Sequence, residues 1–552
     1  ATMGHVFFAV FTLFSIAAMH LIGPVLTSTA IGSERLNRTL DVLLMTPISS
    51  WQLVTGKLFS RLFTALVLIG LSLPVLAIVR LLGGVELEDM FGALALAACV
   101  ALSSAAMGLL LSCWMKRAWA VILMCYLLQA AIYCILPLTI AVLIANSGGS
   151  SSRSMWGWIT VFTASNPLFT AATRTMPGSG MFGGWWEACY VQIGFAACLT
   201  MLSAVIVRRI GRKQAGGRGV TTDAPPTPAP HHLVPADLAP ADLAVPPPLP
   251  SEPYLSTRSN ATSKPISSRA VSNSPILWRE LRQPLFPKLW QRVVAVIAVL
   301  GNLIFSYFAF GFDRSGVGDE DVHIGYAFIL HTLLTLIAVV LSSTAIATEK
   351  ESDTWTLLIV TPVSGGSVVL GKFFGVFRRL FWPWLLVVFH FLFFTVYGVL
   401  SIWSALVVIW VALTFNIVWI ATGLYLSLRL RRVTSAVVTN LLLVLTVYAA
   451  IPILIAVASP RRLWEEYDPS ELCYYWLPYW YLGFGIDEIS SGSRSVLDHG
   501  NTFNVPVVIQ QWPIVYFIHF ALISGLVQVL ISWAILWFAS TRFDKIVGRA
   551  RG

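Results

Sequence analysis

Few residues of this chain are arranged in a way that could do chemistry. The stretch GSVVLGK at 366–372 fits G-x-x-x-x-G-K, a pattern in which backbone amides and the lysine hold the phosphates of a nucleotide. That pattern needs a serine or threonine at the next position, and Phe373 stands there. The sequence has no H-E-x-x-H or G-x-S-x-G motif and no pair of carboxylates inside an apolar run. It therefore favours neither nucleotide binding nor catalysis by this chain, and we expect it not to be an enzyme.

The lysine of that stretch ends a polar segment that occurs twice. Residues 34–57 (ERLNRTLDVLLMTPISSWQLVTGK) and 349–372 (EKESDTWTLLIVTPVSGGSVVLGK) align at an offset of 315 residues, and nine of 24 positions are identical. The identical pairs are Glu34/Glu349, Thr39/Thr354, Leu43/Leu358, Thr46/Thr361, Pro47/Pro362, Ser49/Ser364, Val54/Val369, Gly56/Gly371 and Lys57/Lys372. A loop under no constraint would lose such polar identities first, so the repetition indicates a shared task.

The composition tells which kind of element must position these segments. Hydrophobic residues make up 57% of the 552 residues, charged residues 11%, and the mean hydropathy is +0.77. Soluble domains carry about 25% charged residues, and many apolar runs here reach the roughly 20 residues that cross a bilayer. We therefore expect an all-α polytopic membrane protein.

The apolar runs fall into two parallel repeats with about 11 spans in total. The first repeat, residues 1–213, has five expected spans, at about 6–30, 58–82, 91–114, 118–145 and 187–207. The second repeat, residues 273–552, has six, at about 292–312, 324–347, 374–398, 404–428, 434–458 and 513–539. The first repeat thus lacks a counterpart of the span expected at 292–312, the first span of the second repeat. We expect that the chain starts late, through truncation or a misassigned start, with a naturally asymmetric protein as the alternative.

A segment of different composition joins the repeats. Residues 214–272 are rich in proline and alanine and are expected to form a disordered cytoplasmic linker. An interfacial helix is expected at 273–288, where Pro275 suits a first helical turn. Its apolar stripe would be Leu277, Trp278 and Leu281, with Arg279, Glu280 and Arg282 elsewhere on the helix.

The positions of the basic residues predict the orientation. Lysine and arginine cluster after the expected spans, as at Lys116–Arg117, Arg208–Lys213, Arg429–Arg432 and Arg542–Arg551, and such clusters face the cytoplasm. This threading places both doubled segments and the C-terminus inside, and the acidic loops 86–89 and 313–321 outside. The net charge of +10 is then a topology signal, and no nucleic-acid partner is expected.

Each doubled segment is expected to begin with a short amphipathic helix. Leu36, Leu40, Leu43 and Leu44 in the first copy, and Trp355, Leu358 and Ile359 in the second, follow helical spacing. The helix should stop before the Thr-Pro pair. Ser49 or Ser364 should cap a second helix that runs into the next span, and Ser49 with Gln52 fits a capping box. Lys57 and Lys372 are expected at the membrane border, reaching towards the headgroups.

A family resemblance rests on these residues. The order Glu, Thr, L-L-x-T-P-[IV]-S and a closing Gly-Lys resembles the signature of type-2 ATP-binding cassette (ABC) exporter permeases. NSPILWREL at 273–281 is similar to their connecting helix. SNPLF at 165–169 and WLPYW at 476–480 resemble the external segment before their last span. The resemblance covers about 6–213 and 273–545 and departs from the family in the missing first span and at Trp355–Thr356.

The resemblance implies a permease with two halves in one chain, driven by two copies of a separate ABC ATPase subunit. ATP and magnesium would be bound by those partners, and this chain would hold no cofactor or metal. The doubled segments would be coupling helices that dock on the ATPases, with Glu34 and Glu349 facing basic groups. The docking residues would be Glu34, Thr39, Leu40, Leu43, Thr46, Pro47, Glu349, Thr354, Trp355, Leu358, Thr361 and Pro362. The chain would lie in a bacterial-type plasma (inner) membrane.

Two other functions stay open from the sequence. An ion-gradient-driven secondary transporter would need ionisable groups within its spans, and the candidates are His20, His331, His390 and His519. We expect these to be satisfied packing histidines. A non-transporting membrane scaffold or sensor is the other alternative. The sequence does not define the transported substrate, although apolar walls favour a hydrophobic one.

Overall fold

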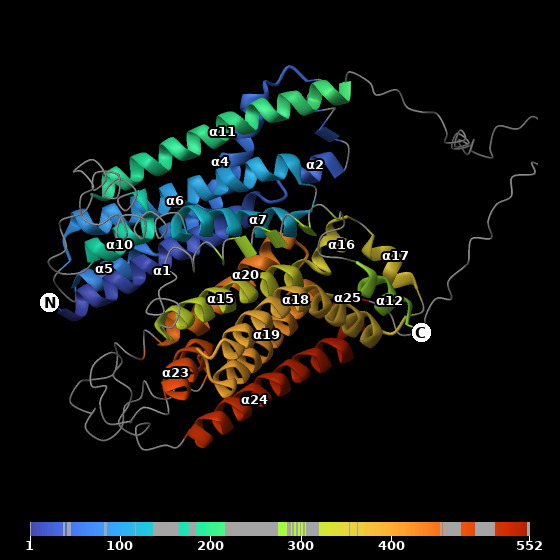
Figure 1. Ribbon diagram of the computed structural model, residues 1–552. Coiled ribbons are helices and arrows are strands. Elements are labelled where there is room, and N and C mark those ends of the chain that lie inside the picture. The colour runs from blue at the N-terminus through green and yellow to red at the C-terminus, as the bar shows by residue number, and fades with distance from the viewer. Residues whose placement is uncertain are drawn as a thin grey trace, which may run out of the picture.

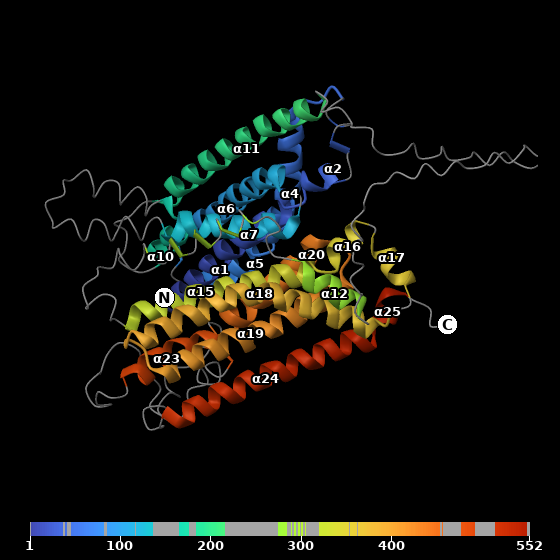
Figure 2. The same ribbon diagram turned by 45° about the vertical axis from the view of Figure 1, so that its right-hand side comes forward.

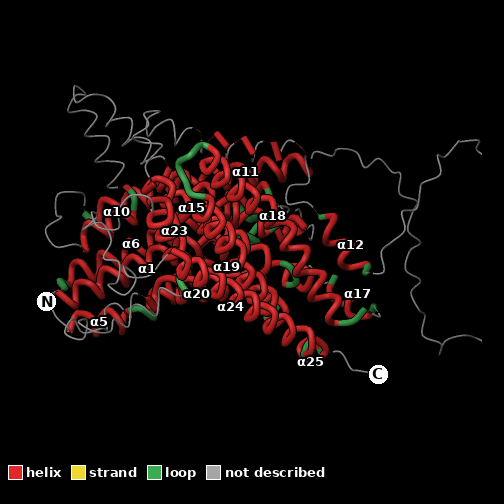
Figure 3. The backbone as a smooth tube through the Cα atoms, turned by 60° about the horizontal axis from the view of Figure 1, so that its bottom comes forward, coloured by secondary structure: helices red, strands yellow, loops and turns green. Residues whose placement is uncertain are grey.

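The computed structural model describes most helices of both repeats. Its larger described ranges are 2–36, 46–81, 85–115, 117–135, 165–175, 184–215, 274–283, 320–352, 354–361, 363–452, 476–491 and 514–548, with single residues or pairs at 39–40 and 43, between 289 and 304, and at 455. Within these ranges the chain is helical and contains no strand (Figures 1 and 3). The all-α prediction is confirmed.

The helices of the first repeat are α1 (Thr2–Thr27), α2 (Gly32–Leu36), α4 (Ser50–Gly70), α5 (Leu73–Leu81), α6 (Leu87–Trp114), α7 (Ala118–Ala130) with the π-helical turn η1 (Ala131–Ile135), α10 (Pro167–Thr175) and α11 (Trp185–Ala215). Those of the second are α12 (Pro275–Arg282), α15 (Glu320–Thr344), α16 (Ala347–Glu351), α17 (Trp355–Val360), α18 (Gly365–Val396), α19 (Ile402–Arg429), α20 (Val433–Leu445) with η3 (Thr446–Ala450), α23 (Pro478–Ser491), α24 (Ile514–Thr541) and α25 (Phe543–Val547).

The sequence repeat extends far beyond the doubled segment. Four elements of the first repeat begin and end 315 residues before their counterparts in the second: α2 and α16, α6 and α19, α7 and α20, and η1 and η3. The register changes only after the π-helical turns, since α10 and α23 begin 311 residues apart. Each repeat is therefore built on the same order of helices.

Among the described residues, nine helices are long and apolar enough to cross a membrane. They correspond to nine of the expected spans, and Ala118–Tyr133 is a shorter apolar helix at the start of a tenth. The expected span at 292–312 lies almost entirely outside the described residues. The span expected at 58–82 differs from the prediction because the helix breaks at Leu71–Ser72, so α4 and α5 share its length. The hydroxyl of Ser72 donates to the carbonyl of Ile69 at this break (2.5 Å).

The two repeats lie side by side and meet through a reciprocal set of helices (Figures 1 and 2). α1 contacts α20, and its counterpart α15 contacts α7, the counterpart of α20. A buried apolar cluster joins them, with Val25 and Ile122 from the first repeat and Val339 and Val437 from the second. This exchange of equivalent contacts is that of a two-fold pseudo-dimer within one chain.

Small residues let the central helices of each repeat cross closely. A Cβ atom at Gly108 of α6 would lie 2.4 Å from the hydroxyl of Thr27 on α1. At the equivalent position, a Cβ atom at Gly423 of α19 would lie 2.0 Å from the hydroxyl of Ser342 on α15. Only glycine fits at both crossings, as is common between membrane helices. These crossings hold α1 and α15, which lead into the doubled segments.

The two ends of the bundle carry different elements. α2, α12, α16, α17 and α25 lie at one end, and α5, α10 and α23 lie at the other (Figure 1). The stretches SNPLF and WLPYW each lead into a short helix, α10 or α23, before the last long helix of their repeat. Both doubled segments thus lie at the same end of the bundle.

Candidate functional site

Both doubled segments fold in the same way around their repeated threonines. The hydroxyl of Thr46 donates to the carbonyl of Leu43 (2.5 Å), and that of Thr361 donates to the carbonyl of Leu358 (2.6 Å). Thr361 has an extended backbone (φ −70°, ψ 145°), so α17 ends before the proline as predicted. Pro362 itself lies outside the described residues. These hydrogen bonds account for the retention of the threonine at this position.

The second repeated threonine also has one structural role in both copies. The hydroxyl of Thr39 donates to the carbonyl of Glu34 (3.4 Å), and that of Thr354 donates to the carbonyl of Glu349 (3.3 Å). Thr39 additionally donates to the carboxylate of Glu34. Both threonines bond back to the preceding glutamate, and in the second copy Thr354 is the N-cap residue of α17.

The short amphipathic helix expected in the second copy is α17, which carries Trp355, Leu358 and Ile359 and ends at Val360. It is separate from the preceding α16, which ends at Glu351; there the hydroxyl of Ser352 donates to the carbonyl of Thr348 (2.9 Å). Side chains of serine and threonine that bond nearby backbone groups compete with the helical hydrogen bonds. The prediction of a short helix that stops before the Thr-Pro pair is therefore confirmed for this copy.

The helix that follows is capped as expected. Ser49 accepts from the amide of Gln52 (3.2 Å), and the amide of Ser49 donates to the side chain of Gln52 (3.0 Å), which completes the capping box. Ser364 accepts from the amide of Ser367 (3.3 Å). The GSVVLGK stretch lies inside the regular helix α18. Its amides serve the helix and form no phosphate-binding loop.

The repeated glutamate and lysine form an ion pair in each copy. Lys57 Nζ lies 2.7 Å from Glu34 Oε1, and Lys372 Nζ lies 2.6 Å from Glu349 Oε1. The side chain of Lys372 is only 4% exposed. Its expected reach towards the headgroups is corrected, because two carboxylates hold its ammonium inside the protein. Glu34 and Glu349 are likewise occupied internally.

In the second repeat the pair belongs to a larger cluster that includes the connecting helix α12. Glu280 of α12 lies 2.8 Å from Lys372 Nζ through Oε1, and 3.0 Å from Arg379 Nη2 through Oε2. Arg279 bridges to Glu349 (2.8 Å) and to Glu280 (3.0 Å). Three cations and two carboxylates thus join α12, α16 and α18.

The electrostatics of Glu280 follow from this setting. The Glu280 side chain is 3% exposed, and burial by itself would raise its pKa. Lys372, Arg379 and Arg279 outweigh burial and hold the pKa of Glu280 below its usual value. The carboxylate stays ionised at neutral pH and fastens α12 to α18.

The cluster corrects the expected faces of α12. Ile276 and Glu280 are the buried residues of this helix, and Leu277, Trp278 and Leu281 are half-buried. Sequence reasoning placed Glu280 away from the packed face and missed Arg379. The available signal was charge: Lys372 and Arg379 lie seven residues apart, on one face of α18, and call for a carboxylate in the helix that packs there.

The expected docking residues divide into buried and exposed ones. Leu40 is 2% exposed and packs with Val54 and Leu58 of its own repeat. Trp355 is 8% exposed, with its ring 6.0 Å from that of Phe543. The idea that these two side chains fill a partner's groove is wrong, because the protein covers them itself. Leu43 and Leu358 are half-buried, and the exposed docking residues are Thr39, Thr46, Pro47, Thr354 and Thr361.

Exposed apolar residues next to the Thr-Pro pairs were not predicted. Val360, the last residue of α17, is 84% exposed, and Ile48 and Trp51 in the first copy are 45% and 46% exposed. Each copy thus presents exposed apolar side chains at the same end of the bundle, where a partner would cover them. Their signal in the sequence was position alone, within four residues of the proline.

The four histidines differ from one another. His20 Nδ1 lies 3.0 Å from the carbonyl oxygen of Ile16, but its buried Nε2 has no hydrogen-bond partner. His331 is 1% exposed, and neither ring nitrogen has a hydrogen-bond partner; its ring meets the edge of Tyr479 at 5.5 Å. The prediction of satisfied packing histidines is therefore wrong for His331 and only half met by His20. His390 packs among phenylalanines, and His519 is exposed.

Comparison with known proteins agrees with this arrangement. A family model described as ABC-2 family transporter protein matches residues 3–211 and 221–524, one region on each repeat. Neither a curated protein nor a solved structure gives a significant match.

Proposed function

This chain belongs to the ABC-2 family of transporter proteins, and we propose that it is an exporter permease driven by separate ABC ATPase subunits. Membership makes it a multi-pass membrane permease of ABC type, whose partners are ABC ATPases. We further infer two ATPase copies, one for each doubled segment, with ATP and magnesium bound on those partners. The membrane would be a bacterial-type plasma membrane, with the doubled segments and the C-terminus in the cytoplasm.

The observation that carries this proposal is the common position of the two doubled segments. They lie at the same end of the bundle and share their threonine hydrogen bonds, their capped helices and their Glu–Lys pairs. Two ATPases that close against each other on one side of a membrane need two equivalent contact points on that side. An inverted repeat, typical of many secondary transporters, would place them on opposite sides.

The mechanical connection runs through rigid helices. In the second repeat, a push on α17 reaches α16 through direct contacts, and α16 is joined to α12 and α18 by the ion cluster. α18 runs from Gly365 to Val396 with Pro383 inside it, so motion at its start is carried at least along the turns before that proline. The doubled segments transmit the motion to the membrane helices, while ATP is hydrolysed by the partner.

We propose that docking depends on the exposed residues beside the Thr-Pro pairs, with Val360 and Ile48 at the centre. A carboxylate there would have to be buried without a partner in the interface, which is costly. The half-buried Leu358 is a poorer choice for mutation, because it packs against the apolar core of its own repeat.

The test is recovery of an ATPase with the tagged full-length chain from its source cells, in mild detergent. We expect wild type to bring down a chain with a Walker motif, identified by mass spectrometry. The double variant Val360→Asp/Ile48→Asp should recover it at least about tenfold less well, since each buried carboxylate costs on the order of 1 kcal/mol or more.

The matched control is Val396→Asp/Ile402→Asp. Val396 and Ile402 are 89% and 47% exposed, close to the values for Val360 and Ile48. Val396 is the last residue of α18 and Ile402 the first of α19, so both lie at the far end of α18 from the doubled segment. The control should recover the ATPase as well as wild type does. Equal recovery by all three proteins would reject the docking surface, and impermeant labels reaching positions 46 and 361 from opposite sides would reject the whole mechanism.

A further inference from the structure

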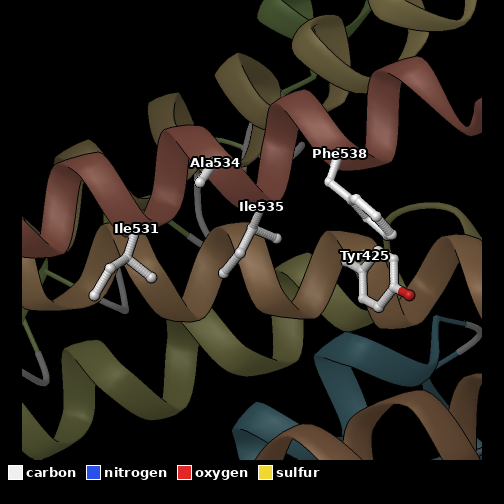
Figure 4. Close-up of a pocket in the computed structure, with 5 residues that line it drawn as sticks. All are labelled: Tyr425, Ile531, Ala534, Ile535 and Phe538. Carbon is white, nitrogen blue, oxygen red and sulfur yellow. The ribbon is translucent and has the colours of Figure 1, made fainter.

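A groove on the outer face of the second repeat lies between α19 and α24, and its lining includes no residue of the doubled segments. It has a volume of about 420 Å³ and is lined by Tyr425, Ile531, Ala534, Ile535 and Phe538 (Figure 4). This volume falls within the range of about 300–1,000 Å³ usual for ligand sites. Its lining is apolar except for the hydroxyl of Tyr425, so it suits a hydrocarbon chain.

The groove opens on a surface that faces away from the other helices. Along α24 the side chains of Leu530, Trp533 and Trp537 are 64%, 65% and 57% exposed. Such a row of exposed apolar residues on a spanning helix faces lipid, and tryptophans gather where the acyl region meets the headgroups. The groove therefore opens towards the bilayer, near its boundary.

Two arginines stand at one end of the groove. Arg429 lies one helical turn beyond Tyr425 on α19 and donates to its hydroxyl (3.4 Å). Arg542 lies one turn beyond Phe538, with its guanidinium 4.6 Å from the ring centre. The rings of Tyr425 and Phe538 are 5.9 Å apart, so the two helices bring both arginines to the same end. Both are exposed, as is Lys545 of α25; Asp544 is the neighbouring carboxylate.

We propose that this groove binds an anionic phospholipid from the leaflet on the docking side. One acyl chain lies along Ile531, Ala534 and Ile535, and the phosphate is held between Arg429 and Arg542. An arginine fork suits phosphate oxygens, and each basic residue near an anionic membrane surface contributes about 1 kcal/mol. The charge complementarity selects a lipid with a net negative headgroup over a zwitterionic one.

The first repeat does not reproduce the site. Trp114 stands at the position equivalent to Arg429, and Leu110, which is 7% exposed, stands at that of Tyr425. The corresponding last long helix, α11, carries the exposed Arg208 and Arg209 at the same end of the bundle. This pair offers equal charge without the Tyr–Arg arrangement and serves as the control.

The experiment measures lipid binding to the purified full chain by native mass spectrometry and by thermal shift. Dioleoyl phosphatidylglycerol is compared with dioleoyl phosphatidylcholine, and inorganic phosphate is the arm for a free anion. We expect phosphatidylglycerol to bind wild type and Arg208→Gln/Arg209→Gln alike, and to bind Arg429→Gln/Arg542→Gln about tenfold or more weakly.

A second variant, Ala534→Phe, fills the groove and keeps both arginines. It should weaken phosphatidylglycerol binding although the charge is unchanged. Equal binding by the two arginine pairs, or by wild type and Ala534→Phe, would overturn the proposal. Saturation of the site by inorganic phosphate alone would also overturn it. So would a wild-type dimer that is lost in the Arg429→Gln/Arg542→Gln variant, because a second copy of the chain would then occupy this face.

Discussion

The two copies of the doubled segment share a sequence pattern but differ in what surrounds it. In the first copy, Lys57 and Glu34 form a pair whose side chains are 29% and 25% exposed, and Thr39 also donates to the Glu34 carboxylate. In the second copy, Lys372 is 4% exposed and contacts both Glu349 and Glu280. The same Glu–Lys pair thus stands at the surface in one repeat and in a buried cluster in the other.

The repeated glycine shows the cause of this difference. A Cβ atom at Gly371 would lie 2.9 Å from the Cγ2 of Ile276 on α12, whereas a Cβ atom at Gly56 would meet nothing within 4 Å. The connecting helix packs directly on α18, and the described residues of the first repeat place no helix against α4 at that point. The Gly-Lys pair therefore marks a packing site for a helix. α12 occupies this site in the second repeat, and no described helix occupies it in the first.

The largest effect should come from removing the lysine of each copy. Lys372→Met leaves the buried Glu280 and the partly exposed Glu349 with fewer cations. Breaking a buried ion pair costs about 3–5 kcal/mol. Lys57→Met should cost less than about 1 kcal/mol, because its pair is partly exposed. Melting temperatures of both variants in detergent measure the difference. Equal losses would mean that the buried cluster contributes nothing beyond the pair.

A smaller effect is expected from alanine at the repeated glycine. Gly371→Ala should destabilise the protein by about 1–2 kcal/mol, since overpacking against Ile276 exceeds the gain in helix propensity. Gly56→Ala should be neutral or stabilising by up to about 1 kcal/mol. Thermal unfolding of both variants decides, and limited proteolysis between 214 and 283 should show that α12 loosens only in Gly371→Ala. A Gly371→Ala variant as stable as wild type would contradict the close packing of α12 on α18 at this glycine.

The smallest effect is the pH dependence that Glu280 gives to the second repeat. Burial alone would raise the pKa of Glu280 above its ordinary value of 4.5, but its three neighbouring cations outweigh burial and lower it. Its contribution to stability is therefore present above about pH 4.5 and lost as the pH falls through the lowered value. The stability gap between wild type and Glu280→Gln should be constant from pH 7 to 5 and narrow below that. If the stability difference between the two proteins is unchanged at pH 3, it arises from packing and not from the charge of Glu280.

Much of the architecture could be predicted from the sequence, because helix length and local signals decide it. The apolar runs gave the long helices, and Ser49 with Gln52 gave the capping box. The site was harder because it depends on contacts between distant segments. Nothing local says that Glu280 turns inward to Lys372, or that Trp355 is covered by Phe543.

The π-helical turns η1 and η3 give the repeat a final consequence. They occupy Ala131–Ile135 and Thr446–Ala450, directly after α7 and α20. A turn closed over five residues takes up one more residue than an α-helical turn, so every later side chain is rotated by about 100°. Tyr133 meets His20 and Tyr448 meets Trp419 within these turns, from directions that the winding of α7 and α20 alone would not give. A helical wheel drawn straight through either turn would assign the wrong residues to the wall between the repeats.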